Sequence, residues 1–162
     1  MPKTIKNIYD NSVSFENLLK AHKKARCGKR EKKKIILFEL KLEQELLELD
    51  KQLKNGRYKH GGYTKFKIYE PKERIIMASE YKDRVVHQWY VEKFIKPYFV
   101  PQFISTSYAG IEGRGMHKAS KDVQKAMRSA KSKWKNYYIL KMDVTKYFQN
   151  IDKRILWKIL KR

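Results

Sequence analysis

The chain has 162 residues, of which 41% are apolar, so it is long enough for a packed core and is not disordered by composition. Lys and Arg number 39 against 17 Asp and Glu, which leaves a net charge of +22. This excess predicts a polyanionic partner, with nucleic acid the first candidate and an anionic membrane surface the second. A fragment that lacks the acidic part of a longer protein would show the same excess. No segment reaches the ~18 apolar residues of a membrane span, so we expect no membrane insertion.

The single cysteine, Cys27, allows no disulfide within the chain, and the N-terminus lacks the apolar core of a signal peptide. Both observations predict a reducing compartment, and we expect a cytoplasmic protein. Cys27 itself is expected to serve as a small residue in helix packing.

Residues 1–60 are predicted to form a helical N-terminal extension. One helix is expected over residues 12–27, with Ser14 as its N-cap, and a longer one over residues 35–54. The longer helix carries leucines at steps of four, three and four, which is the spacing of one helical face. These residues are Leu42, Leu46, Leu49 and Leu53.

After Gly61-Gly62 the period changes to that of strands. Residues 63–69 alternate β-formers with lysines, residues 70–73 read as a turn, and residues 74–78 form a second β-rich run. This pattern predicts a β-hairpin with a basic face and a basic tip, made by Lys65, Lys67, Lys72 and Arg74. The cationic face is suited to phosphates; the alternative is an edge hairpin that lysines keep soluble.

A helix over residues 80–96 follows, and Pro97 is expected to end it. The loop after it contains Gly113-Arg114-Gly115 and leads into a helix at about 116–131 with an apolar inner side and a basic outer side. Backbone N–H groups and an arginine at a helix N-terminus make a generic anion site. The spacing lacks the lysine and hydroxyl of a P-loop.

The last part of the chain begins with an apolar run, residues 137–142, that is predicted to be a buried strand. Asp143 stands at its end, where a rigid element would present the carboxylate to a cleft. Mg²⁺ prefers such hard oxygen donors and often takes only one or two protein carboxylates. A second acid, Asp152, is predicted to cap a final helix over residues 153–162.

Three blocks of this sequence together resemble bacterial reverse transcriptases of the group II intron-like and diversity-generating retroelement types. The first is Tyr69–Ile76 followed by Tyr81–His87, which resembles their fingers. The second is Ser107–Ala109 with Gly113–Ala119, and the third, Lys141–Asp152, resembles the first palm motif. Their order and spacing agree with the family over about residues 60–162.

The resemblance implies an α+β chain made of the helical extension 1–60, fingers at 61–136 and the beginning of a right-hand polymerase palm at 137–162. It implies an RNA-directed DNA polymerase with an RNA template, a DNA primer and dNTP. Asp143 would be the first metal-binding aspartate, and the backbone carbonyl of Val144 a further ligand, for Mg²⁺ or for Mn²⁺ in its place. Phe148 would lie under the incoming sugar and exclude a 2′-hydroxyl.

The same resemblance implies roles for basic residues. Arg74, with Lys72 or Lys67, would hold the nucleotide triphosphate, and Gly113-Arg114-Gly115 would lie along the template path. Arginine suits the first role because its guanidinium contacts phosphate in a bidentate manner. The positive excess would follow the template and primer backbones.

One feature departs from the family pattern. The second set of metal-binding aspartates lies in a Tyr/Phe-x-Asp-Asp hairpin, and no Asp-Asp dipeptide occurs in these 162 residues. Asp152 lies too close in sequence to Asp143 to replace it. We therefore expect that this chain alone does not polymerise. It would be either a truncated gene product or an incomplete part of a longer enzyme.

Two other classes remain open on the sequence. One is a nucleic-acid-binding module without catalysis, either a maturase-like RNA binder or a degenerate polymerase remnant. The other is a basic structural or ribosome-associated protein.

Overall fold

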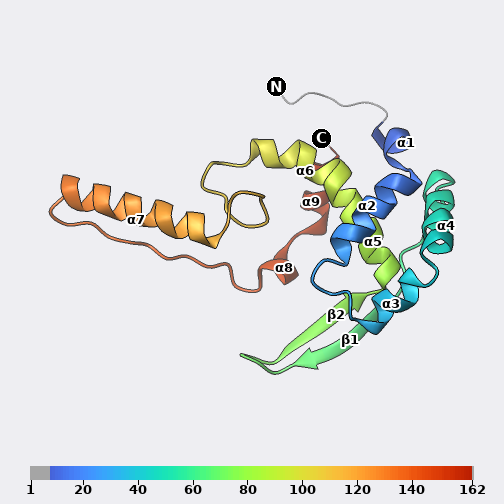
Figure 1. Ribbon diagram of the computed structural model, residues 1–162. Coiled ribbons are helices and arrows are strands. Elements are labelled where there is room, and N and C mark those ends of the chain that lie inside the picture. The colour runs from blue at the N-terminus through green and yellow to red at the C-terminus, as the bar shows by residue number, and fades with distance from the viewer. Residues whose placement is uncertain (1–7, 162) are drawn as a thin grey trace. The chain divides into compact units, whose positions relative to one another are not determined.

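The computed structural model describes residues 8–161, which form two compact units that divide between Ser107 and Tyr108 (Figure 1). The first unit contains helices α1 to α6 and two strands, and the second contains α7 to α9. Within these residues, helices and one small antiparallel sheet make the protein α+β, which confirms the predicted fold class at that level.

The helix predicted over residues 12–27 is α2 (Phe15–Ala25), and an unpredicted short helix, α1 (Ile8–Ser12), precedes it. They are separated because Ser14 is extended and acts as the N-cap of α2, with its Oγ accepting from the backbone N–H of Asn17 at 3.3 Å. The predicted cap is thus confirmed. The predicted packing role of Cys27 is wrong, since α2 ends before Cys27 and leaves it exposed.

The helix predicted over residues 35–54 is two helices, α3 (Lys33–Glu39) and α4 (Leu42–Lys54). The break lies at Leu40-Lys41, where Lys41 departs from helical geometry with φ −122° and ψ 29°. The break leaves α3 and α4 separately oriented, and each buries apolar side chains in the same core. The leucine stripe of α4 is confirmed, because Leu46, Leu49 and Leu53 are buried.

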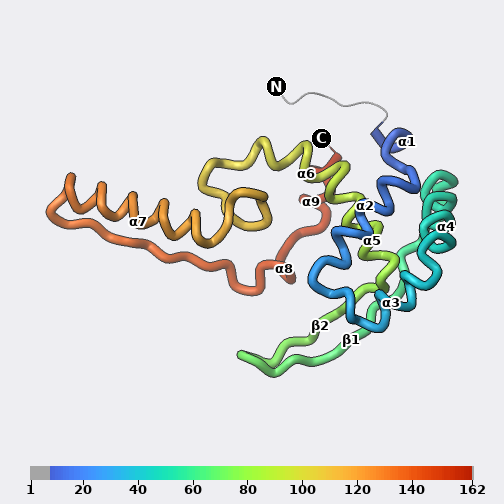
Figure 2. Tube along the Cα trace, viewed as in Figure 1, coloured from blue at the N-terminus to red at the C-terminus, as the bar shows by residue number. Residues whose placement is uncertain are grey.

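The core of the first unit forms where α2 packs against α4 and α5, and where α3 packs against α4 and α5 (Figure 2). Its fully buried apolar side chains are Leu18, Ile35, Leu46, Leu49 and Val85. The short helix α1 is tied to this core by hydrogen bonds. Trp89 Nε1–H donates to the Ser12 carbonyl at 2.9 Å, and the Tyr9 hydroxyl donates to the Leu53 carbonyl at 2.7 Å.

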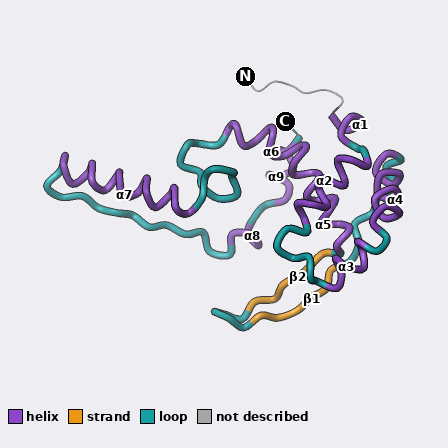
Figure 3. The backbone as a smooth tube through the Cα atoms, viewed as in Figure 1, coloured by secondary structure: helices purple, strands orange, loops and turns teal. Residues whose placement is uncertain are grey.

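The predicted β-hairpin is confirmed as β1 (Tyr63–Ile68) and β2 (Arg74–Ser79), the orange strands of Figure 3. Its basic residues do not share one face, which corrects the prediction. Lys67 pairs with Ile75 and Ile68 pairs with Arg74 in the register. Because side chains alternate between faces along a strand, Lys65 and Lys67 lie on one face and Arg74 on the other.

The helix after the hairpin does not end at Pro97, contrary to the prediction. Helix α5 (Tyr81–Tyr90) continues through a π-helical turn (Val91–Ile95) into α6 (Lys96–Phe99) and a 3₁₀ turn (Val100–Gln102). Proline is tolerated there because it lies in the first turn of α6, where its missing N–H costs little.

In the second unit, α7 (Met116–Lys133) is followed by an irregular segment, then by α8 (Tyr147–Asn150) and α9 (Lys153–Leu160). Helix α7 begins at Met116, as expected, and Gly115 is its N-cap. Asp152 caps α9 as predicted, because its Oδ1 accepts from the backbone N–H of Arg154 at 2.8 Å. No helix of residues 8–161 combines the length and apolarity needed to cross a bilayer.

The strand predicted over residues 137–142 is absent: this segment has no regular secondary structure and its side chains are exposed. β-Formers make a strand only when their backbone groups bond to a neighbouring strand. Among the described residues, the ladder pairs β1 only with β2. The structure therefore shows no palm sheet in residues 8–161.

Candidate nucleotide and nucleic-acid interface

The hairpin presents three of the predicted nucleotide-binding residues, Lys67, Lys72 and Arg74, all with exposed side chains. Lys67 Nζ donates to Glu73 Oε1 at 2.7 Å across the turn. Both partners are more than half exposed, so water screens this ion pair and a phosphate can compete for the lysine. The hairpin thus brings these cations to one end, near its turn.

A buried carboxylate holds the foot of the hairpin. Asp83, in the first turn of α5, is fully buried. Its Oδ1 accepts from the Tyr58 hydroxyl at 2.6 Å, and its Oδ2 accepts from the Gly61 N–H at 3.1 Å. Burial first, and then this hydrogen bond, raise the pKa of Tyr58, so the phenol stays protonated as the donor. The segment that enters β1 is therefore fixed to α5.

Gly61 is required at this foot for reasons of space. A Cβ at this position would lie 2.9 Å from Asp83 Oδ2 and 3.3 Å from Glu80 Cγ. The Gly61-Gly62 pair was visible in the sequence as a change of period. Its contact with a carboxylate 22 residues away had no sequence signal.

Three rings stack beside this carboxylate. His60 stacks on His87 at 5.2 Å between ring centroids and on Tyr63 at 5.0 Å. His60 Nδ1 lies 2.6 Å from the Gly61 carbonyl oxygen and 3.8 Å from Asp83 Oδ2. The stack joins the first residue of β1 to the middle of α5, so the start of the hairpin has a rigid base.

The glycine loop predicted to lie along a template has the geometry of a tight turn. Gly113 has φ +73°, which favours glycine, and the backbone N–H of Arg114 donates to the Ile111 carbonyl at 3.1 Å. Gly115 is the N-cap of α7. Tyr108 is joined to this helix, since its hydroxyl donates to Asp122 Oδ2 at 2.9 Å. The predicted loop-to-helix arrangement is therefore present.

The predicted metal-binding stretch lies in the second unit on an irregular backbone. Asp143 and Val144 are exposed, and Phe148, on α8, is 87% exposed. The turn between them is tight: Lys146 has φ +50°, and Asn150 Nδ2 donates to the Thr145 carbonyl at 2.9 Å. No regular strand holds the carboxylate here.

The donor chemistry of Asp143 and Val144 agrees with Mg²⁺, because a carboxylate and a backbone carbonyl are hard oxygen ligands. Across residues 8–161, no three His, Cys, Asp or Glu side chains cluster closely enough to hold a metal ion. These two residues would thus provide part of a coordination shell, with phosphate oxygens and water as the usual remainder.

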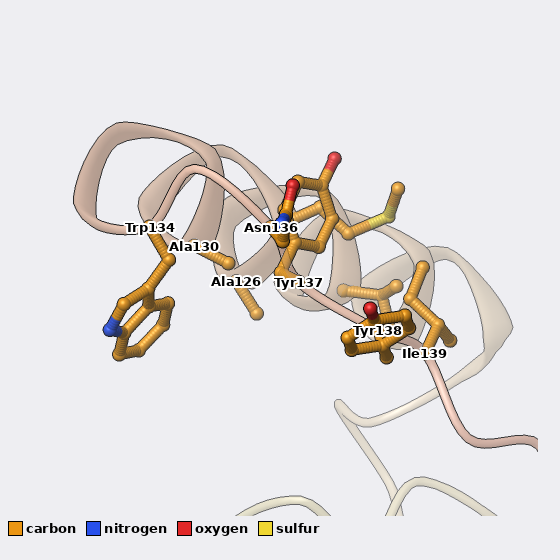
Figure 4. A pocket seen from close by; sticks show the side chains of 9 residues that line it. Ala126, Ala130, Trp134, Asn136, Tyr137, Tyr138 and Ile139 are labelled. Atoms are coloured by element: carbon orange, nitrogen blue, oxygen red, sulfur yellow. The ribbon is translucent and has the colours of Figure 1, made fainter.

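A groove of about 590 Å³, which no sequence pattern indicated, lies between α7 and the segment that follows it (Figure 4). Val123, Ala126 and Ala130 line it from the helix, and Tyr137 and Ile139 line it from the segment. The apolar side of α7 therefore faces residues 136–139, which agrees with its predicted inner side.

A scan against protein-family models and a search of curated proteins give no match to this chain. The resemblance to reverse transcriptases thus depends on the three sequence blocks alone.

Proposed function

We propose that residues 1–162 are the N-terminal part of an RNA-directed DNA polymerase: a helical extension, the fingers and the first palm motif. The observation that carries this proposal is the order of the three sequence blocks, which end in Lys141–Asp152. The hairpin, the glycine loop leading into α7 and the charge of +22 support it. The template is RNA, the primer is DNA, and the polymerase belongs to the cytoplasm.

In this proposal the hairpin binds the triphosphate of the incoming nucleotide. Arg74 contacts phosphate in a bidentate manner, and Lys72 or Lys67 adds a second positive charge. The buried Asp83 fixes the foot of the hairpin and so limits its movement. Fixed cations favour transfer mainly by orienting the phosphates and by stabilising charge.

The carboxylate of Asp143 and the carbonyl of Val144 would hold one of two catalytic ions. When bound, Mg²⁺ (or Mn²⁺ in its place) lowers the barrier by stabilising charge on the attacking and leaving oxygens. Phe148 lies five residues after Asp143 and would contact the sugar face of the nucleotide. Gly113-Arg114-Gly115 would bind the template backbone. The further carboxylates of a two-metal site would come from a Tyr/Phe-x-Asp-Asp hairpin elsewhere in the polymerase.

The role of Phe148 gives a test in the protein encoded by the full reading frame that contains these residues. That protein should extend a DNA primer on an RNA template. Phe148→Val should raise ribonucleotide incorporation by about 10–100-fold, because room for a 2′-hydroxyl replaces an aromatic ring. Incorporation is measured with each rNTP and dNTP in single-nucleotide extension.

The matched control is the neighbouring aromatic, Tyr147, whose ring lies 5.2 Å from that of Phe148. Tyr147→Val should leave sugar discrimination as it is. Unchanged discrimination in Phe148→Val, or an equal change in both variants, would remove Phe148 from the sugar site.

The second candidate is a nucleic-acid-binding module without catalysis, which the charge of +22 favours. It predicts salt-dependent binding of nucleic acid with no extension of any primer by the full reading frame. Tight binding to generic duplex RNA, without preference for a primer terminus, would instead favour a basic structural or ribosome-associated protein.

A further inference from the structure

Helix α7 carries a row of cations on the side away from its groove. We call this row the basic stripe: Lys118, Lys121, Lys125 and Arg128, all exposed. Their spacing of three, four and three residues places them along one side of a helix. The apolar residues that line the groove lie on the opposite side, so packing of α7 against residues 136–139 turns the stripe outward.

The basic stripe lowers the stability of α7, because its like charges repel one another. An exposed helix side with charges of both signs would not have this cost. Like charges three or four residues apart destabilise a helix by about 0.2–0.5 kcal/mol per pair. The one acid on α7, Asp122, already accepts from Tyr108 at 2.9 Å and from Lys118 at 3.2 Å. No carboxylate among residues 8–161 forms an ion pair with Lys121, Lys125 or Arg128 within 4.0 Å.

The exposed side of α4 shows the contrast. It mixes both signs, and Lys54 donates to Asp50 at 2.7 Å while Gln52 donates to Glu48 at 2.8 Å. Such i, i+4 pairs stabilise an exposed helix. The exposed side of α4 thus carries polar side chains in pairs, whereas the exposed side of α7 carries a row of charges of one sign.

We propose that the basic stripe of α7 binds the sugar-phosphate backbone of a nucleic-acid duplex, outside the nucleotide site. From Lys118 to Arg128 the helix rises about 15 Å, over which a duplex carries about nine phosphate charges on its two strands. Each cation of the stripe can therefore meet a phosphate. The inference rests on the proposed function for its partner, the template–primer duplex, and needs no catalytic step.

An anionic membrane surface suits α7 less well. A helix that lies in a bilayer interface carries Lys and Arg on its polar side and inserts its apolar side, which must therefore be free. In α7 the apolar side faces residues 136–139 instead (Figure 4). The spacing of the basic stripe places it on the other side of the helix. A nucleic-acid duplex is a rigid, hydrated polyanion, and it can bind a straight row of cations without any contact to an apolar surface.

The test compares two triple variants of this chain that lose the same three positive charges. The stripe variant is Lys121→Gln, Lys125→Gln and Arg128→Gln, which keeps good helix formers in α7. The control variant is Lys51→Gln, Lys54→Gln and Arg57→Gln, all exposed positions at the end of α4 and just beyond it. Circular dichroism confirms that both keep the helix content of the parent chain.

Binding is measured by fluorescence anisotropy with a labelled RNA–DNA hybrid duplex over a series of salt concentrations. The stripe variant should bind about tenfold or more weakly near 150 mM salt, and the slope of log K against log[salt] should fall by about 2–3. The control variant should change the slope by less than about one.

Equal losses in both variants would show an effect of net charge alone and overturn the proposal. It is also overturned if the stripe variant binds the hybrid like the parent, or loses binding only to phosphatidylserine-containing vesicles. If the protein encoded by the full reading frame does not extend a primer, the proposed polymerase function is contradicted. The binding results for the basic stripe would still hold.

Discussion

At the scale of single residues, contacts with neighbours in the sequence can be predicted from the sequence, whereas contacts between distant residues cannot. Ser14 and Asp152 were predicted as caps because a cap needs only its own side chain and the next few N–H groups. Asp83 lies in the first turn of α5. Its burial and its bond to Tyr58, 25 residues away, depend on how α5 packs, which no local pattern encodes.

The Asp83 contacts predict a specific sensitivity. In Asp83→Asn, an amide of the same shape can accept from only one of Tyr58 and Gly61, and its NH₂ group faces the other donor. We expect the free energy of unfolding to fall by about 2 kcal/mol or more, measured by urea denaturation. Glu43→Gln, at an exposed acid on α4, should change it by less than about 0.5 kcal/mol. Equal losses of stability in Asp83→Asn and Glu43→Gln would contradict the proposed role of Asp83 at the foot of the hairpin.

A second buried polar residue, His22, predicts a pH dependence. Its Nδ1 lies 3.1 Å from the Tyr81 hydroxyl, and its Nε2 lies 3.2 Å from Glu39 Oε1. Burial, and next the charge of Arg26, hold the pKa of His22 below its usual 6.5 despite Glu39. Between the folded pKa and 6.5 the unfolded chain binds more protons, so stability is complete above pH 6.5 and falls as the pH drops below it.

The measurement is the free energy of unfolding from pH 7.5 to pH 5. His22→Gln removes the proton-binding group and should make that dependence shallower, while His117→Gln, at an exposed position, should leave it as it is. A profile that is identical in His22→Gln and the parent would show that His22 does not titrate differently on folding.

At the scale of elements, periodic patterns predicted the helices and the hairpin, but not how they are interrupted. The spacing of the leucines indicated the buried face of α4. The alternation of β-formers with lysines indicated β1, and a run of β-formers indicated β2. The periodicity did not indicate the break at Lys41 or the new helical turn that begins at Lys96 and accommodates Pro97. The strand at residues 137–142 failed because β-propensity describes a segment, while a strand also requires a partner.

The rotation of α4 can be tested with two adjacent leucines. Leu46 is fully buried and Leu47 is 51% exposed. Leu46→Ala should lower the free energy of unfolding by about 2–5 kcal/mol, because it removes buried methyl groups and leaves a cavity. Leu47→Ala should cost less than about 1 kcal/mol by the same urea titration. Similar costs at both positions would contradict the observed burial.

At the scale of the whole molecule, the predicted site residues divide between the two units. Lys67, Lys72 and Arg74 belong to the first unit, and Asp143 and Phe148 belong to the second. The predicted boundaries at residues 60 and 136 followed the family resemblance, while the compact units divide after Ser107. The sequence blocks, more than the packing, therefore carry the polymerase proposal.

The most direct test of that proposal compares the two acids of the first palm motif in the full reading frame that contains this chain. Asp143→Asn removes a proposed metal ligand, whereas Asp152→Asn replaces one good helix cap with another. The measurement is Mg²⁺-dependent extension of a DNA primer on an RNA template. We predict that Asp143→Asn abolishes extension while template–primer binding is retained, and that Asp152→Asn extends like the parent. Extension by Asp143→Asn at the rate of the parent would contradict the account.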